Sequence, residues 1–183
     1  HLLGVIAHQK GDHERSVDLI EKALTLKPDY AEAHCNLGIS YKELGRLDDA
    51  ASSYRRAIEI KPDYAEAHNN LGNILRELER LEEAVACYKN AIAIKPDYAE
   101  AYNNQGGALL GLNKFEEASA SLQKALTLNP DYAEAHCDLG VVFKELGRFD
   151  EAGECYQRAL AIQSNYFEAI YNLGNLLQER GKL

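Results

Sequence analysis

The sequence predicts an all-α fold, an α-solenoid in which short helical hairpins repeat along the chain. A phrase that reads KPDYAEAHCNLG at its first occurrence returns with small changes, starting at Lys27, Lys61, Lys95 and Asn129. The 4 prolines of the chain lie 34 residues apart, at Pro28, Pro62, Pro96 and Pro130. A fixed period of roughly 20 to 50 residues is typical of stacked units, each too small to bury its own apolar face.

Each repeat contains two predicted helices. In residues 31–44, Leu37 and Tyr41 fall on one apolar stripe with helical spacing. Gly45 follows, at a place where a helix ends most easily in the left-handed conformation. The second helix ends before Pro62, because proline has no amide hydrogen to continue the ladder. The repeat is therefore a helix, a turn and a second helix, which we call helix A and helix B.

Two further features predict how helix A is capped and how it packs against helix B. Asp63 stands three residues before Glu66, a spacing that predicts a capping box at the start of the next helix A. A glycine in mid-helix costs about 1 kcal/mol relative to alanine. Its regular return at Gly38 and equivalent positions therefore predicts close helix packing, with Gly38 facing Ala50.

These positions resemble the tetratricopeptide repeat (TPR) family. With Ala31 as position 1, the family pattern is filled by Leu37, Gly38, Tyr41, Ala50, Tyr54, Ala57 and Pro62. Departures are local: Leu122 replaces an aromatic residue, and Glu79 and Asn113 replace the turn glycine. The resemblance implies about eleven helices in a right-handed superhelix, with helices A on the concave face, a role in binding peptides or protein segments, and nothing catalytic.

The repeat boundaries follow from this register. We expect a single array over residues 1–183, with a clipped first repeat in 1–30, full repeats in 31–64, 65–98, 99–132 and 133–166, and helix A of a last, clipped repeat in 167–183. Leu173, Leu176 and Leu177 are then expected to lack a covering helix. An uncovered apolar face usually marks an interface, so we expect either self-association through this C-terminal helix or its docking on chain outside this segment.

The composition of the chain disfavours several classes of function. A net charge of −9 disfavours binding to nucleic acid or to an anionic membrane. No apolar run approaches the roughly 18 to 20 residues that span a bilayer, so we expect a soluble chain. Free cysteines fit a reducing compartment, so the expected location is cytoplasmic. The 4 cysteines have no metal-site spacing, and His34, His68 and His136 occupy a packing position. We expect no cofactor, no bound metal and no catalytic residue.

The candidate binding residues lie on helix A, at positions 5, 6 and 9, on the side opposite the packing stripe. They are Asn36, Asn69, Asn70, Asn73, Asn103, Asn104, Asp138, Asn172 and Asn175. A carboxamide both donates and accepts hydrogen bonds, so such a row can hold the backbone of an extended peptide. It can equally bond the neighbouring repeat, and the sequence leaves both interpretations open.

Two functions fit these features. The first is a non-enzymatic scaffold that binds an extended peptide or protein segment in the concave groove. The second is the substrate-recognition arm of a larger enzyme, because the asparagine row resembles the TPR superhelix of O-linked N-acetylglucosamine transferases. The family's other well-known role, the clamp for acidic chaperone tails, is disfavoured. It needs cations on helix A, where position 2 holds Glu32, Glu66, Glu100, Glu134 and Glu168.

Overall fold

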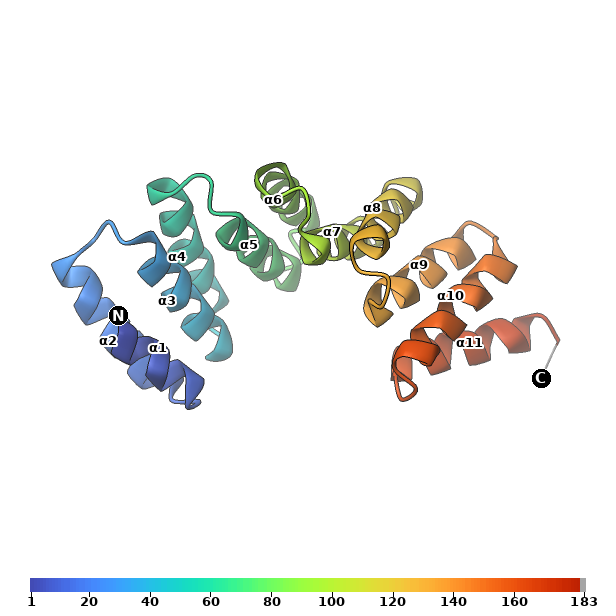
Figure 1. Ribbon diagram of the computed structural model, residues 1–183, viewed down its shortest axis with the longest axis horizontal. Coiled ribbons are helices and arrows are strands. Elements are labelled where there is room, and N and C mark those ends of the chain that lie inside the picture. Colours follow the sequence, from blue (N-terminus) through green and yellow to red (C-terminus); the bar gives the residue numbers. More distant parts are fainter. Residues whose placement is uncertain (182–183) are drawn as a thin grey trace. The chain divides into compact units, whose positions relative to one another are not determined.

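The structure is a computed structural model that describes residues 1–181, and within that range it consists of eleven α-helices and no strand (Figure 1). The helices are α1 (Leu2–Gln9), α2 (His13–Leu26), α3 (Ala31–Glu43), α4 (Leu47–Ile60), α5 (Ala65–Glu77), α6 (Leu81–Ile94), α7 (Ala99–Gly111), α8 (Phe115–Leu128), α9 (Ala133–Glu145), α10 (Phe149–Ile162) and α11 (Phe167–Glu179). The predicted alternation of helices A and B is confirmed. Residues 182 and 183 of the last predicted repeat lie outside the described range.

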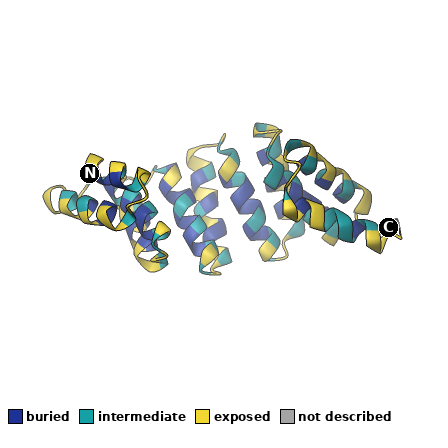
Figure 2. Ribbon diagram, turned by 90° about the horizontal axis from the view of Figure 1, so that it is seen from below, coloured by how far each residue is buried: buried dark blue, intermediate teal, exposed yellow. Residues whose placement is uncertain are grey.

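The helices form two compact units. The first spans His1–Lys95 and contains α1 to α6, and the second begins at Pro96 and contains α7 to α11. Within each unit, consecutive helices pack against one another, and the buried residues lie on the sides where those helices meet (Figure 2). The single array over 1–183 stays a prediction, because each unit is defined by its own internal packing.

Helix A and helix B of one repeat meet at a glycine and a ring. A Cβ atom added to Gly72 would lie 2.6 Å from the Tyr88 ring, and one added to Gly38 would lie 2.7 Å from the Tyr54 ring. Both tyrosines are fully buried. The close approach predicted from the glycines is therefore present, but the expected partner is wrong. The nearest atoms to Gly38 belong to Tyr54 rather than to Ala50, because the long aromatic side chain fills the space that glycine leaves.

The turns keep their left-handed residue even where glycine is missing. Gly45 has φ 70° and Gly147 has φ 73°. Glu79 and Asn113 hold the equivalent places with φ 58° and φ 57°. Residues with a Cβ atom adopt this conformation at a cost of roughly 1–2 kcal/mol, least for asparagine. The packing of the flanking helices thus imposes the turn, and the substitutions change its energy rather than its shape.

The predicted capping box is absent. The N-cap of α5 is Tyr64, one residue after Asp63, and no side chain caps this helix. Asp63 therefore stands one residue too early to accept from the first turn. In an equivalent loop, Asp29 instead forms an exposed ion pair with Arg56 of α4, at 3.0 Å. The aspartates of these loops therefore do not serve as helix caps.

The repeated histidines hold the loops between repeats. Nε2 of His68 lies 3.0 Å from the carbonyl oxygen of Pro62, six residues earlier. His34 and His136 make the same contact with Pro28 and Pro130, at 2.8 and 2.9 Å. An Nε2–H group donating to a carbonyl oxygen satisfies both partners. The prediction that these histidines are satisfied is confirmed, but each bonds the loop before its own helix rather than another helix. The contact ties the end of one repeat to helix A of the next.

Candidate functional site

The position-6 asparagines bond the preceding repeat. Nδ2 of Asn36 donates to Nε2 of His1 at 2.8 Å. Nδ2 of Asn172 donates to Sγ of Cys137 at 3.8 Å, and Asn70 makes the equivalent hydrogen bond with Cys35. In each case the partner occupies position 5 of the preceding helix A. The interpretation of the row as a tie between repeats therefore has direct contacts in its favour within each unit.

Three of the candidate residues are buried. Asn69 is 0% exposed, Asn103 is 1% exposed and Asn104 is 7% exposed. The expectation that these side chains face an open groove is therefore wrong for Asn69 and Asn103 at position 5 and for Asn104 at position 6. For Asn103 the physical reason is that its helix, α7, packs on the next helix A of the same unit, α9. A helical-wheel projection of a single hairpin does not include this helix of the next repeat.

Asn103 is also unsatisfied. Neither its Nδ2 nor its Oδ1 atom has a hydrogen-bond partner among the described residues, although both atoms are buried. A buried polar group left without a partner costs roughly 1–3 kcal/mol. Cys35 and Cys137 fill the same position in other repeats with a side chain that tolerates burial better. Asn103 is therefore a weak point in the packing of the second unit.

Asn73, at position 9, contacts its own repeat. Its Oδ1 atom accepts a hydrogen bond of 2.8 Å from the hydroxyl group of Tyr88 in α6. Asn73 therefore joins helix A to helix B, and only part of its side chain is exposed. The remaining candidates are all half-buried: Asn36, Asn70, Asp138, Asn172 and Asn175.

An acidic row runs beside these amides. The glutamates at position 2 lie one helical turn before position 6, so the two positions share a helix face. Glu32 and Glu66 are exposed in the first unit, and Glu168 is exposed in the second. We use the name acid–amide surface for positions 2 and 6 of those repeats in which neither residue is buried. It consists of Glu32, Asn36, Glu66 and Asn70 in the first unit, and of Glu134, Asp138, Glu168 and Asn172 in the second.

Lysines at position 12 of helix A are paired with acids. Nζ of Lys42 lies 3.3 Å from a carboxylate oxygen of Glu77, and Nζ of Lys144 lies 3.3 Å from one of Glu179. Each pair joins two consecutive helices A. These cations therefore do not offset the negative charge of the glutamates at position 2.

The cysteines are free thiols. Burial raises the pKa of Cys87, Cys137 and Cys155 to about 11, so each stays protonated near neutral pH. A protonated thiol is a poor nucleophile and a poor metal ligand. Among residues 1–181, no group of three or more His, Cys, Asp and Glu side chains is placed to hold a metal ion.

The uncovered face of α11 differs from the predicted one. Leu176 is only 2% exposed, because it packs beside Gly153 of α10. A Cβ atom added to Gly153 would lie 3.6 Å from Cδ2 of Leu176. Leu173 and Leu177 are half-buried. The exposed apolar side chains are instead Phe167, Ile170 and Tyr171, at 71%, 49% and 60%. The expectation of an uncovered leucine face is therefore wrong for Leu176, and the apolar patch lies one or two turns earlier.

The helical hairpins, their ties between repeats and the exposed polar face of helix A define a protein-interaction scaffold. The sequence pattern of the TPR repeat matches residues 4–45, 40–75, 72–112, 106–147 and 142–181. The chain therefore belongs to the TPR repeat family. None of the described helices has both the length and the apolar character needed to cross a membrane.

Solved structures of several other proteins are similar to this chain. The type IV pilus biogenesis factor PilW is 25% identical with a TM-score of 0.88, over 99% of this chain and 84% of PilW. MamA is 25% identical with a TM-score of 0.82, over 88% of this chain and 94% of MamA. TTC0263, a thermophilic TPR protein in Thermus thermophilus, is 26% identical with a TM-score of 0.73 and 96% coverage of both chains. Among curated proteins, no sequence matches significantly.

Proposed function

We propose that the acid–amide surface of each unit binds an extended, basic segment of a partner protein, and that the chain itself is not an enzyme. The observation that carries this proposal is the pairing of exposed glutamates at position 2 with half-buried amides at position 6 on one helix face. The amides are already anchored through Nδ2, which leaves their oxygen atoms to accept hydrogen bonds from a peptide backbone. The glutamates supply charge that attracts lysine and arginine.

The overall charge supports the same class of partner. A chain of net charge −9 repels nucleic acid and acidic peptides and attracts basic segments. Lys42 of helix A is paired with Glu77, so it does not offset the negative charge of the glutamates at position 2. An acidic peptide would meet the glutamates at position 2 without a matching cation among the residues of the acid–amide surface. We therefore favour a partner segment rich in lysine or arginine.

The test compares peptides of opposite charge. Fluorescence anisotropy with labelled lysine-rich and glutamate-rich peptides of equal length should show binding of the basic peptide only. The double variant Glu32→Gln and Glu66→Gln should weaken that binding by roughly tenfold, because two exposed charges of the surface are lost.

The matched control carries the same charge change elsewhere. Glu82→Gln with Glu116→Gln removes two exposed carboxylates from helices B and should leave the affinity nearly unchanged. An equal loss in both double variants would mean that only the net charge matters. Preferential binding of the acidic peptide would contradict the proposal outright.

We further propose that the patch of Phe167, Ile170 and Tyr171 on α11 docks on a second copy of this chain. The rings of Phe167 and Tyr171 stack with centroids 6.4 Å apart, so these two exposed side chains form one apolar cluster. The half-exposed side chain of Phe149 on the neighbouring helix α10 adds to the exposed apolar area of the same unit. Contiguous apolar surface of this kind is typical of an interface between proteins.

Light scattering tests this association. The mass should rise above 20.4 kDa as the protein concentration increases, and the variant Phe167→Ser with Tyr171→Ser should stay monomeric. Leu26→Ser is the control, because Leu26 is 88% exposed on α2 and lies outside the patch. A constant monomeric mass at every concentration would exclude the second copy as the occupant.

A further inference from the structure

We propose that His8 and His13 together bind one divalent transition-metal ion through their Nδ1 atoms. His8 lies in the last turn of α1, and His13 is the first residue of α2. Their Nδ1 atoms face each other at 3.2 Å, and the ring centroids are 4.9 Å apart. The short turn between the two helices thus brings two imidazole nitrogens to one point.

The separation of the two nitrogens fits a shared ion. Imidazole nitrogens bind Zn²⁺ at about 2.0–2.1 Å, so two of them at a tetrahedral angle lie about 3.3 Å apart. Without an ion, one ring donates its Nδ1–H group to the other ring. With an ion, the donating ring moves its proton from Nδ1 to Nε2. Both rings then stay neutral, and both Nδ1 lone pairs are available to the metal.

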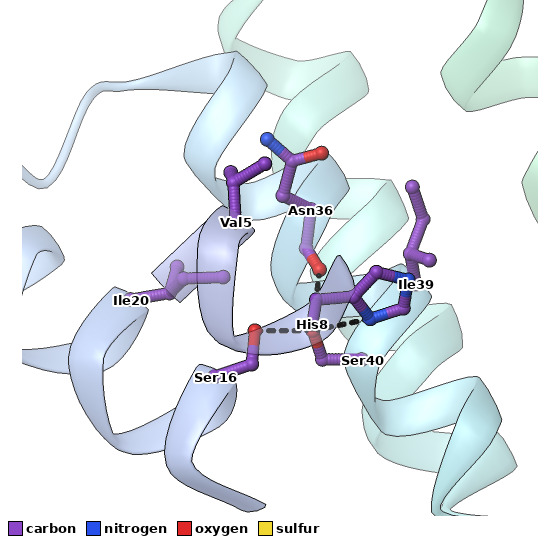
Figure 3. Close-up of a pocket in the computed structure, with 7 residues that line it drawn as sticks. All are labelled: Val5, His8, Ser16, Ile20, Asn36, Ile39 and Ser40. Atoms are coloured by element: carbon purple, nitrogen blue, oxygen red, sulfur yellow. Dashed lines mark hydrogen bonds between the residues drawn. The ribbon is translucent and has the colours of Figure 1, made fainter. Parts of the chain in front are cut away.

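The surroundings hold His8 in place. Its Nδ1 atom lies 3.5 Å from the hydroxyl oxygen of Ser40 on α3, and Ser40 contacts the buried Ser16 at 2.8 Å (Figure 3). These residues line a cavity of about 20 Å³, which has room for about one water molecule. The ring of His8 is therefore packed against α3 of the neighbouring repeat on the side of this cavity.

The turn holds His13 in place and leaves the pair accessible. Oδ1 of Asp12 accepts from the backbone N–H group of Arg15 at 3.2 Å and caps α2. This contact fixes the first turn of the helix, on which His13 lies. Both histidines are half-buried, so an ion can enter from solvent and water can complete its coordination.

The internal repeats supply an independent argument. His8 is at position 12, where other repeats carry Lys42, Arg76, Leu110 and Lys144. His13 is at position 17, where they carry Leu47, Leu81, Phe115 and Phe149. The first repeat therefore departs from the others at two positions at once, and both changes place an imidazole at the same point. The remaining repeated histidines, such as His34, use Nε2 on a proline carbonyl.

The imidazole ligands of His8 and His13 determine which metal ions the site prefers. Imidazole prefers Zn²⁺, Ni²⁺ and Cu²⁺, whereas Mg²⁺ and Ca²⁺ prefer oxygen ligands. Isothermal titration of the untagged full chain with Zn²⁺ should give one ion per chain. An excess of Mg²⁺ should not change the result.

Variants that restore the repeat pattern test the site without disturbing the fold. His8→Lys and His13→Leu introduce residues that the equivalent positions of other repeats already carry, and each should weaken Zn²⁺ binding by roughly tenfold or more. Circular dichroism should show unchanged helix content. His34→Gln and His1→Ala are the controls, and both should keep the affinity of the unsubstituted chain. Unchanged affinity in His8→Lys and His13→Leu, or a loss seen only in His1→Ala, would overturn the proposal.

Discussion

Replacing Gly140 with alanine is expected to lower the free energy of unfolding by about 1–3 kcal/mol, although alanine is the better helix former. The added Cβ atom would lie 2.5 Å from the Tyr156 ring. That ring is fully buried, so it cannot move aside without displacing α10 from α9. The overlap therefore outweighs the gain of about 1 kcal/mol in helix propensity.

Gly174 provides the matched control for this prediction. It occupies the same repeat position in α11, where no atom lies within 4 Å of an added Cβ. Gly174→Ala should therefore raise stability by up to about 1 kcal/mol. Urea unfolding followed by circular dichroism, with hydrogen exchange to locate the affected helices, measures both variants. Equal effects from the two substitutions would mean that helix propensity, not packing, decides the outcome.

The second large effect is expected at the buried tyrosines. Tyr88→Phe should destabilise the first unit by about 1 kcal/mol, because it removes the hydrogen bond to Asn73. Tyr156→Phe should be neutral or stabilising by a similar amount. The Tyr156 hydroxyl group is buried without a partner among the described residues, since Val141 replaces the asparagine at position 9.

A third variant separates this explanation from general packing. Val141→Asn introduces an acceptor at the position that Asn73 holds in the other unit, so it should stabilise the chain by about 1 kcal/mol. The gain should vanish in the background of Tyr156→Phe, which a double-mutant cycle in urea detects. A gain that persists in the phenylalanine background would rule out the hydrogen bond as its cause.

Much of the fold could be predicted from local signals. Pro62 marks the end of a helix B, and α4 ends at Ile60. Gly45 marks the end of a helix A, and it adopts the left-handed conformation. These signals act through the backbone of one or two residues, so they can be recognised without knowledge of the neighbours. The capping box at Asp63 failed because a shift of a single residue between N′ and N-cap changes which atoms meet.

The candidate site was only partly predictable. The periodicity of helix A placed Asn36, Asn70 and Asn172 on one face, and they do share equivalent contacts with the preceding repeat. It did not reveal that Asn69 and Asn103 are buried. For Asn103 the covering helix, α9, belongs to the next hairpin of the same unit. The spacing of four residues between Glu66 and Asn70 was the available signal for the acid–amide surface.

The sequence by itself determined the repeat, its register and the type of every described helix, because proline, glycine and the spacing of apolar residues act within one hairpin. Only the tertiary structure decided which amides are anchored, which are buried and which nitrogens converge. The 3.2 Å contact of His8 with His13 and the unsatisfied amide of Asn103 depend on side-chain directions at junctions between helices. Those directions are set by packing, which a linear pattern does not contain.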